Sequence, residues 1–226
     1  MKQIITLSET HLMVYIGEHI DVTQASKMAM LREHVERLFP DLIDVIPSYT
    51  SLMIEFHPLK TDVSVLIGEL ERLLVSFDDF AVRQASQLIE LPVFYDPQVA
   101  PDLDPLSKRC QLSRQQVIDI HSQQEYTVCA VGFAPGFAFL GAVDERIAAP
   151  RHAEPRLKVA KGSVGIADQQ TAVYPAASPG GWQVIGNCPL DLFDVNRTPM
   201  TPFTVGDTVK FTPITRERFI ELGGQL

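Results

Sequence analysis

The chain has 226 residues, of which 46% are hydrophobic and 21% are charged, and its formal net charge is −9. This composition is typical of a folded globular protein and excludes a mainly disordered chain. The negative charge argues against broad electrostatic binding to nucleic acid or to an anionic membrane. A chain of this length is expected to form one large domain or two small ones.

The sequence shows no membrane span and no secretion signal. No apolar run approaches the roughly 18 residues that a transmembrane helix needs. Polar residues at positions 8–11 interrupt the N-terminal segment before the apolar stretch of a signal peptide can form. The three cysteines, Cys110, Cys129 and Cys188, are widely spaced and do not predict a disulfide framework. We therefore expect a cytoplasmic protein.

The N-terminal part of the chain alternates between strand and helix patterns. Apolar residues at helical spacing predict helices over residues 24–39 and 62–77. Short apolar or alternating runs predict strands at residues 12–16, 42–46, 51–56 and 87–95. This alternation predicts a small α+β domain over residues 1–85. The segment 96–105, rich in proline and aspartate, has the composition of a linker.

Residues 86–226 are expected to form a β-rich domain that includes a helical linker segment near residues 96–122. Ser113 and Gln116 have the spacing of a capping box at the start of a short helix. Short segments separated by Gly, Pro, Asp or Asn then predict strands at residues 126–133, 159, 164–167, 171–174, 182–185 and 208–212. Short strands of this kind usually close into a barrel or a sandwich.

The region between residues 131 and 187 concentrates unusual features. It holds eight of the chain's 13 glycines, and glycine is used where the backbone turns with positive φ or approaches another group closely. Between residues 146 and 161 there are five Lys or Arg residues and one acid, in contrast to the acidic average. This local cationic patch suits a small anionic ligand or an acidic partner surface.

The cations of this patch have two interpretations. Arg151 and Arg156 each follow a proline, which restricts the backbone, and a guanidinium group can hold a carboxylate by two parallel hydrogen bonds. Alternatively, both arginines form surface ion pairs worth about 0–1 kcal/mol. Lys161 either places its ammonium group beside a tight turn at Gly162 or is simply solvated.

The PAASPGGW turn is similarly open to two interpretations. Gly180 and Gly181 either present backbone N–H groups to an anion, as anion-binding nests do, or reverse the chain together with Pro179. In the second case Trp182 fills the core of the barrel.

Three more residues are candidates for the rim of a pocket. The block GFAPGFAF is ambiguous in the same way: Phe133, Phe137 and Phe139 are candidates for the core, and Pro135 and Gly136 for the rim. His121, at the end of its predicted helix, is either a general base or a C-terminal helix cap.

Motifs for self-sufficient chemistry are absent from the sequence. There is no P-loop, no GxGxxG, no HExxH and no CxxC, and KGSVG around Ser163 is not a nucleophile elbow. We therefore predict no metal site and assign no catalytic residue. Any nucleotide chemistry has to come from another chain.

The ordered blocks GFAPGFAFLG, PRHAEPR, KGSVGIADQQTAVYP, SPGGWQVIGN and VGDTVKF carry a family resemblance. They resemble the family that contains the B subunit of 5-oxoprolinase, allophanate hydrolase subunit 1 and the sporulation histidine-kinase inhibitor. The resemblance extends from about residue 4 to residue 213. It implies a ferredoxin-like α+β N-terminal domain followed by an all-β, cyclophilin-like barrel domain.

The resemblance also implies a non-autonomous subunit of an ATP-dependent 5-oxoprolinase, which converts 5-oxo-L-proline to L-glutamate. The implied partners are the other two components of that enzyme, a carboxyltransferase-like C subunit and an A subunit. ATP is then used by the complex, and this chain alone binds no cofactor. Two alternatives remain: an inhibitor that binds the dimerisation helices of a histidine kinase, and a component of an allophanate or urea-derivative hydrolase.

When the motif positions of the family are transferred to this sequence, the resemblance implies that a group of residues lies at one binding face. These are Arg151, Arg156, Ser163, Pro179, Gly180, Gly181 and Trp182, with His121, Pro135 and Gly136 nearby. The sequence departs from the family pattern at Asn187 and Cys188, where arginine and threonine are usual. The loss of that arginine removes a candidate anion contact, and Lys161 on the neighbouring loop restores a positive charge. We therefore include Lys161 among the substrate-binding candidates.

Overall fold

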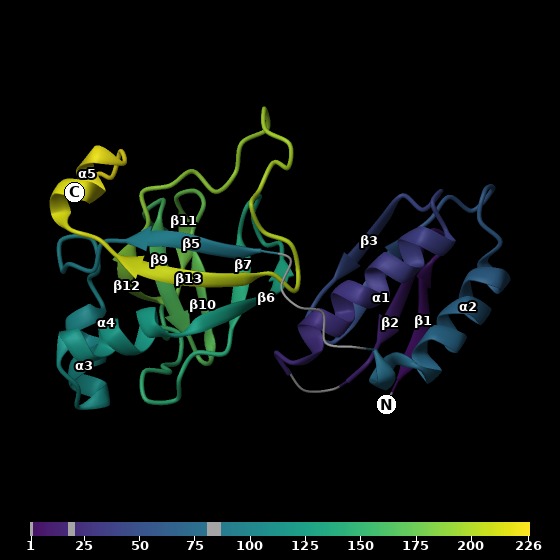
Figure 1. Ribbon diagram of the computed structural model, residues 1–226, viewed down its shortest axis with the longest axis horizontal. Coiled ribbons are helices and arrows are strands. Elements are labelled where there is room, and N and C mark those ends of the chain that lie inside the picture. Colours follow the sequence, from purple (N-terminus) through teal and green to yellow (C-terminus); the bar gives the residue numbers. More distant parts are fainter. Residues whose placement is uncertain (1, 18–20, 81–86) are drawn as a thin grey trace. The chain divides into compact units, whose positions relative to one another are not determined.

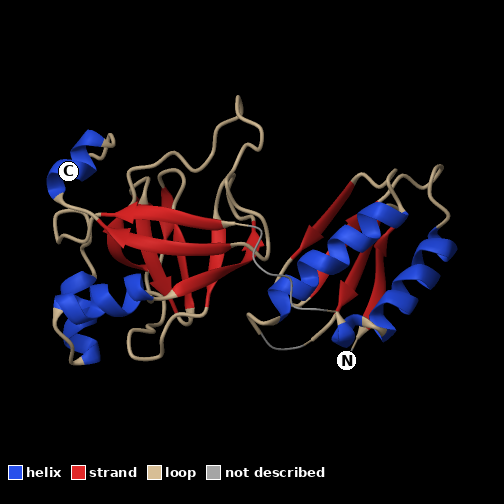
Figure 2. Cartoon of the chain, in the orientation of Figure 1, coloured by secondary structure: helices blue, strands red, loops and turns tan. Residues whose placement is uncertain are grey.

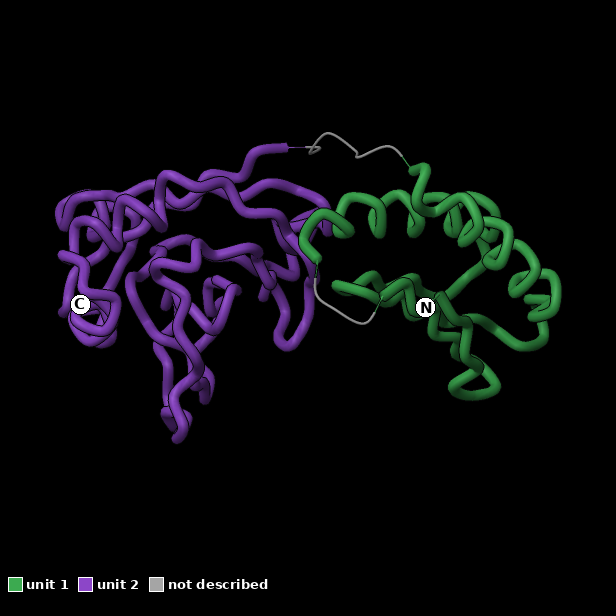
Figure 3. Tube along the Cα trace, turned by 90° about the horizontal axis from the view of Figure 1, so that it is seen from below, with its two compact units in different colours: residues 1–86 green, residues 87–226 purple. Residues whose placement is uncertain are grey.

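The computed structural model describes residues 2–17, 21–80 and 87–226, and the chain divides into two compact units, residues 1–86 and 87–226 (Figure 3). Each unit has a hydrophobic core of its own. The division lies one residue from the predicted boundary between residues 85 and 86.

Unit 1 contains, in its described part, a four-stranded antiparallel sheet with the order β1-β2-β4-β3 (Figure 1). The strands are β1 (Gln3–Ser8), β2 (His11–Tyr15), β3 (Asp44–Pro47) and β4 (Ser51–Glu55). Helices α1 (Gln24–Leu38) and α2 (Val63–Val75) cover one face of the sheet (Figure 2), and the short 3₁₀ helix η1 (Phe77–Asp79) follows. Alternate strand residues pack against both helices to form the core, for example Leu12, Val14, Leu52 and Ile54.

The two helices of unit 1 form where the apolar spacing predicts them, and α2 begins at a clear N-cap. The side chain of Asp62 accepts hydrogen bonds from the backbone N–H groups of Ser64 and Val65, at 2.9 and 3.3 Å. The ferredoxin-like prediction is not confirmed in its strand order. A ferredoxin-like domain runs βαββαβ, whereas the described order here is ββαββα. The additional strand is at the start of the chain: β1 precedes β2 and pairs with it at the edge of the sheet.

Unit 2 is built on a seven-stranded sheet with the order β12-β9-β10-β7-β6-β13-β5. Its strands are β5 (Leu88–Val93), β6 (Glu125–Val131), β7 (Ala138–Gly141), β9 (Ser163–Ala167), β10 (Gln170–Val173), β12 (Gln183–Asn187) and β13 (Thr208–Pro213). A bridge between Phe94 and Asn187 joins the two edges, so the sheet nearly closes into a barrel. The predicted barrel is thus confirmed at this level. A separate two-stranded ribbon pairs β8 (Arg156–Val159) with β11 (Ser178–Gly180).

Unit 2 is not all-β, because it also contains α3 (Leu103–Cys110), α4 (Arg114–Gln123) and α5 (Arg216–Glu221). The capping box predicted for α4 is confirmed: the side chains of Ser113 and Gln116 each accept from the other residue's backbone N–H. The prediction of a domain linker at residues 96–105 is wrong. Ala100 and Leu103 are buried, and the backbone N–H of Asp102 donates to the carbonyl of Val184 at 3.0 Å. Prolines and aspartates here shape turns that pack onto the barrel.

Candidate functional site

A buried carboxylate organises the region around β8 and β12. Asp102, which precedes α3, accepts a hydrogen bond from the backbone N–H of Val184 at 2.7 Å and one from Nη2 of Arg156 at 2.6 Å. Nε2 of His152 lies 3.2 Å from the same Oδ1 atom without forming a hydrogen bond. Sequence reasoning missed Asp102 and His152, since Asp102 is 54 residues from Arg156 and no local pattern connects them.

Arg156 therefore has a carboxylate partner inside the protein. Its Nη1 also lies 3.4 Å from the carbonyl oxygen of Trp182. The pair with Asp102 differs from the surface ion pair that we considered, because one of its two charges is buried. Arg156 is consequently held in a fixed orientation at the start of β8.

Arg151 and Trp182 come together in a different way. The Cζ atom of Arg151 lies 5.7 Å from the centroid of the Trp182 ring, a cation–π distance. Trp182 is buried and packs edge-on against Phe137 and Tyr174, with ring centroids 5.8 and 6.4 Å apart. The interpretation of Trp182 as a core residue is confirmed. Phe137 is also core, whereas Phe133 is exposed with a positive φ of 73°, which corrects its prediction as core.

The glycines of the PAASPGGW turn allow close packing. Neither Gly180 nor Gly181 has the positive φ that an anion-binding nest requires. A Cβ atom on Gly180 would lie 2.5 Å from the hydroxyl oxygen of Tyr174, and the carbonyl of Gly181 accepts from the N–H of His152 at 2.7 Å. Pro179 is exposed beside them on β11. Glycine is thus needed in this turn because Tyr174 and the segment that contains His152 pack closely against it.

The structure places none of the three additional rim candidates at the wall of either described cavity. Gly136 is buried with φ of 80°, and a Cβ atom there would lie 2.6 Å from the carbonyl oxygen of Leu192; Pro135 is exposed. His121 is fully buried, with Nδ1 2.8 Å from the hydroxyl of Tyr95 and Nε2 3.0 Å from Oγ1 of Thr171. Burial lowers the pKa of His121 to about 3. A neutral, enclosed imidazole is neither a general base at a pocket nor a charged helix cap.

Unit 2 contains a cleft of about 820 Å³, here called the unit 2 cleft. Its walls are residues 97–101, β8, the loop before β9, the end of β12 and residues 222–226. Arg156, Lys161 and Ser163 of the predicted substrate-binding set line it, whereas Arg151, Gly180, Gly181 and Trp182 do not. Cavities that bind small molecules usually measure about 300–1,000 Å³.

Strand β9 brings Ser163 to this cleft. Val164 and Ile166 point into the barrel core, so alternation places Ser163 and Gly165 on the opposite face. Gly165 lies beneath Trp182, where an added Cβ atom would be 3.0 Å from the Cβ atom of Trp182. Lys161, just before β9, forms an ion pair with Asp191, so it is not simply solvated.

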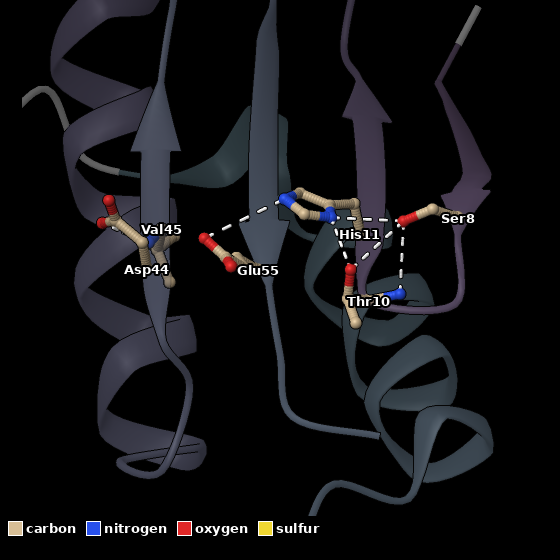
Figure 4. Close-up of polar contacts among 6 residues, drawn as sticks. All are labelled: Ser8, Thr10, His11, Asp44, Val45 and Glu55. Carbon is tan, nitrogen blue, oxygen red and sulfur yellow. Dashed lines mark hydrogen bonds and ion pairs between the residues drawn. The ribbon is translucent and has the colours of Figure 1, made fainter.

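Unit 1 contains a polar cluster that sequence reasoning also missed (Figure 4). Nδ1 of His11 lies 2.8 Å from Oγ1 of Thr10 and 3.2 Å from Oγ of Ser8, and its Nε2 lies 3.9 Å from a carboxylate oxygen of Glu55. A serine, a histidine and a glutamate in contact are typical of nucleophilic catalysis. These three residues line neither the unit 2 cleft nor the cleft beside Lys2 and Ile4 in unit 1, and we assign no reaction to them.

Comparison with known proteins places this fold and these motifs in one family. The family described as carboxyltransferase domain, subdomain C and D, matches residues 2–203. The chain belongs to this family. No helix among the described residues is long and apolar enough to cross a membrane.

Close relatives within the family share a name. The B subunit of 5-oxoprolinase from Bacillus subtilis is 39% identical over 96% of this chain and 95% of its own length. The protein of the same name from Escherichia coli O157:H7 is 40% identical, over 85% of this chain and 88% of its own length.

Solved structures agree with the family assignment. TTHA0988 superposes with a TM-score of 0.76 at 32% identity and covers 91% of this chain, which spans only 40% of that protein. The urea carboxylase of Kluyveromyces lactis has a TM-score of 0.71 at 19% identity over 97% of this chain and 22% of its own, which shows the shared fold alone.

Proposed function

We propose that this protein is one component of an ATP-dependent 5-oxoprolinase, which converts 5-oxo-L-proline to L-glutamate together with partner subunits. The observation that carries this proposal is the identity of about 40%, over most of both chains, with relatives named as the B subunit of 5-oxoprolinase. The reaction is the hydrolysis of a cyclic amide, so the substrate has one carboxylate and one lactam group.

The partners in this proposal are a carboxyltransferase-like C subunit and an A subunit, which supply the ATP chemistry. Two observations support a division of labour. The sequence has no P-loop and no GxGxxG motif. TTHA0988, of which this chain spans 40%, joins an equivalent region to further polypeptide in one chain. We place the anion contacts of this protein in the cationic segment 146–161, part of which lines the unit 2 cleft.

A reconstitution experiment tests the function. The chain is co-purified with the candidate A and C subunits, and glutamate release from 5-oxo-L-proline is measured with and without ATP. We expect ATP-dependent release from the complex, and neither release nor ATP binding by calorimetry from the single chain. Turnover by the single chain would refute the division of labour. A complex that assembles but releases no glutamate would refute the substrate.

A further inference from the structure

One edge of the unit 1 sheet is a strand without the usual features that prevent pairing with another chain. In the order β1-β2-β4-β3, the outer side of β1 faces no other strand among the described residues. Alternate residues of β1 therefore direct their backbone N–H and carbonyl groups away from the sheet. Edge strands are commonly protected by a charged residue or a proline. Strand β3, at the opposite edge, has Asp44 and Pro47, whereas β1 contains neither a charged residue nor a proline.

Lys2, which immediately precedes β1, does not protect this edge. Its Nζ donates to the carbonyl of Leu74 and to the carboxylate of Asp78, both at 2.8 Å. These contacts hold the Lys2 side chain against the end of α2. Most residues of β1 are exposed, including Thr6 and Leu7. The edge is thus accessible to an incoming strand.

The cleft beside Lys2 and Ile4 adjoins this edge and has a volume of about 500 Å³; it is here called the unit 1 cleft. Both β1 and α2 line it, and Figure 1 shows α2 along the β1 side of the sheet. Ile4 and Thr6 line the cleft from β1. They pair with the core residues Val14 and Leu12, so they lie on the face of the sheet that the helices cover. A strand added to β1 directs alternate side chains to this same face.

The helix wall of the unit 1 cleft has a spacing that matches a strand. Ile67, Glu71 and Val75 follow one another at intervals of four residues on α2, and all three line the cleft. Four helical residues advance by about 6 Å, and two strand residues advance by about 6.4–6.8 Å. Alternate side chains of an added strand can therefore contact these three helix residues one to one.

The chemistry of this wall is apolar, acidic, apolar. Glu71 is exposed and has no ion-pair partner among the described residues. Val75 is 84% exposed, although it is apolar. A strand with a basic side chain between two apolar ones complements this wall, because the cation faces Glu71 and the apolar groups cover Ile67 and Val75.

We propose that unit 1 binds an extended segment of another protein, which adds to β1 as a fifth strand and places apolar, basic and apolar side chains of alternate residues in the unit 1 cleft. Main-chain hydrogen bonds to β1 supply affinity, and the cleft supplies specificity. A second copy of this chain is not the occupant, because its own β1 has no basic residue to place opposite Glu71. The proposal concerns unit 1 and is independent of the proposed function.

The test uses the full chain and a synthetic hexapeptide, acetyl-Val-Thr-Lys-Thr-Val-Thr-amide, whose first, third and fifth residues carry the required pattern. Binding is followed by NMR of the isotope-labelled chain. We expect saturable shifts of backbone amides in β1 and α2 and none in unit 2. A peptide with glutamate in place of the lysine should bind about 5-fold more weakly, because it faces Glu71 with a like charge.

Two N-methylated versions of the peptide test the strand pairing. The N–H groups of successive residues in a strand point to opposite edges. Methylation of the second and fourth residues therefore blocks one edge, and methylation of the third and fifth residues blocks the other. One of these peptides should bind at least about 10-fold more weakly than the other, because it loses backbone hydrogen bonds to β1.

Single substitutions on α2 then assign the side-chain contacts. Glu71→Lys should weaken binding of the lysine peptide by about 5-fold and strengthen binding of the glutamate peptide by a similar factor. Val75→Ser should weaken both peptides by about 3-fold, since it removes apolar contact area. Glu145→Lys is the matched control, because Glu145 is an exposed glutamate of unit 2, and it should change neither affinity. Glu71 and Val75 are both exposed, so neither substitution alters the core, and circular dichroism verifies that each variant is folded.

Three results would overturn the proposal: no saturable binding of the lysine peptide, equal binding of the two N-methylated peptides, or equal affinity of the Glu71→Lys and Glu145→Lys variants for the lysine peptide. Sedimentation equilibrium provides a fourth test. A dimeric chain that binds no peptide would show that a second copy occupies the edge, which also contradicts the proposal. None of these outcomes changes the expected release of glutamate by the reconstituted complex, so the two proposals are judged separately.

Discussion

Replacement of Arg156 by alanine should destabilise unit 2, because it removes the cation that faces a buried carboxylate. In the native protein Nη2 of Arg156 lies 2.6 Å from Oδ1 of Asp102, whose side chain is only 4% exposed. The variant retains the hydrogen bond from the N–H of Val184 to the other carboxylate oxygen at 2.7 Å. Asp102 is thus left with one strong donor and no strong cation.

The size of the effect follows from the exposure of the two partners. Removing one member of a fully buried ion pair costs about 3–5 kcal/mol, whereas an exposed pair contributes about 0–1 kcal/mol. The side chain of Arg156 is 32% exposed, so solvent screens part of the interaction. We expect the free energy of unfolding of unit 2 to fall by about 2–3 kcal/mol.

Trp182 makes the measurement specific to unit 2, because it is the chain's single tryptophan and packs beside this network. Urea unfolding followed by tryptophan fluorescence gives the free energy of unfolding for the wild type, Arg156→Ala, Asp102→Asn and the double variant. Asp102→Asn keeps an acceptor for the N–H of Val184 and removes the charge. The double-mutant cycle should therefore give a coupling energy of about 1–2 kcal/mol.

A loss below about 0.5 kcal/mol for Arg156→Ala, together with a coupling energy near zero, would refute the reasoning. The pair would then have the energetics of an exposed surface contact. Equal losses in Arg156→Ala and in the double variant would also contradict it, because removal of the charge at Asp102 should relieve the unpaired carboxylate.

Two further predictions concern buried positions. Burial lowers the pKa of His121 to about 3, from an ordinary value of 6.5. As the pH drops, the unfolded state therefore takes up the proton before the folded state does. The free energy of unfolding should fall by up to about 1.4 kcal/mol per pH unit between pH 6.5 and pH 3. Urea unfolding at pH 7 and pH 5 should show a smaller difference for His121→Gln than for the wild type, and identical differences would contradict the assignment. Gly162→Ala should destabilise the protein by more than about 1 kcal/mol in thermal unfolding followed by circular dichroism, since φ is 80° and the new Cβ atom would meet the carbonyl of Cys188. Gly68→Ala in α2, where nothing lies within 4 Å, should instead stabilise by about 0.5–1 kcal/mol, and the same sign for both alanines would refute the packing argument.

The secondary structure of the chain was largely predictable, and the exceptions have local causes. Both helices of unit 1 and the capping box of α4 follow from apolar spacing and cap residues. Strand β1 (Gln3–Ser8) was not predicted, because its residues do not alternate cleanly and most of its side chains are exposed. The supposed linker at residues 96–105 was misread because proline and aspartate indicate turns without indicating whether the turns pack against a core.

The candidate site was predictable only in outline. The motif blocks placed Arg156, Lys161 and Ser163 in one functional region, and the structure brings these three to one cleft. They also grouped His121 with that region, although its ring is enclosed between α4 and the barrel. Residue type and order along the chain cannot distinguish a histidine on a cleft wall from one in a core, because the difference lies in what packs against it.

What the sequence determined by itself was the set of interactions that act over a few residues: the helices, the caps, the alternation of β9 that sets Ser163 apart from Val164, and the cationic excess of residues 146–161. The partners of the cations were decided by the tertiary structure. Asp102 neutralises Arg156 across 54 residues and Asp191 neutralises Lys161 across 30, whereas Arg151 and Lys158 have no ion-pair partner among the described residues. Ion pairing depends on distance in space, and the fold of the barrel brings together residues that lie far apart in the sequence.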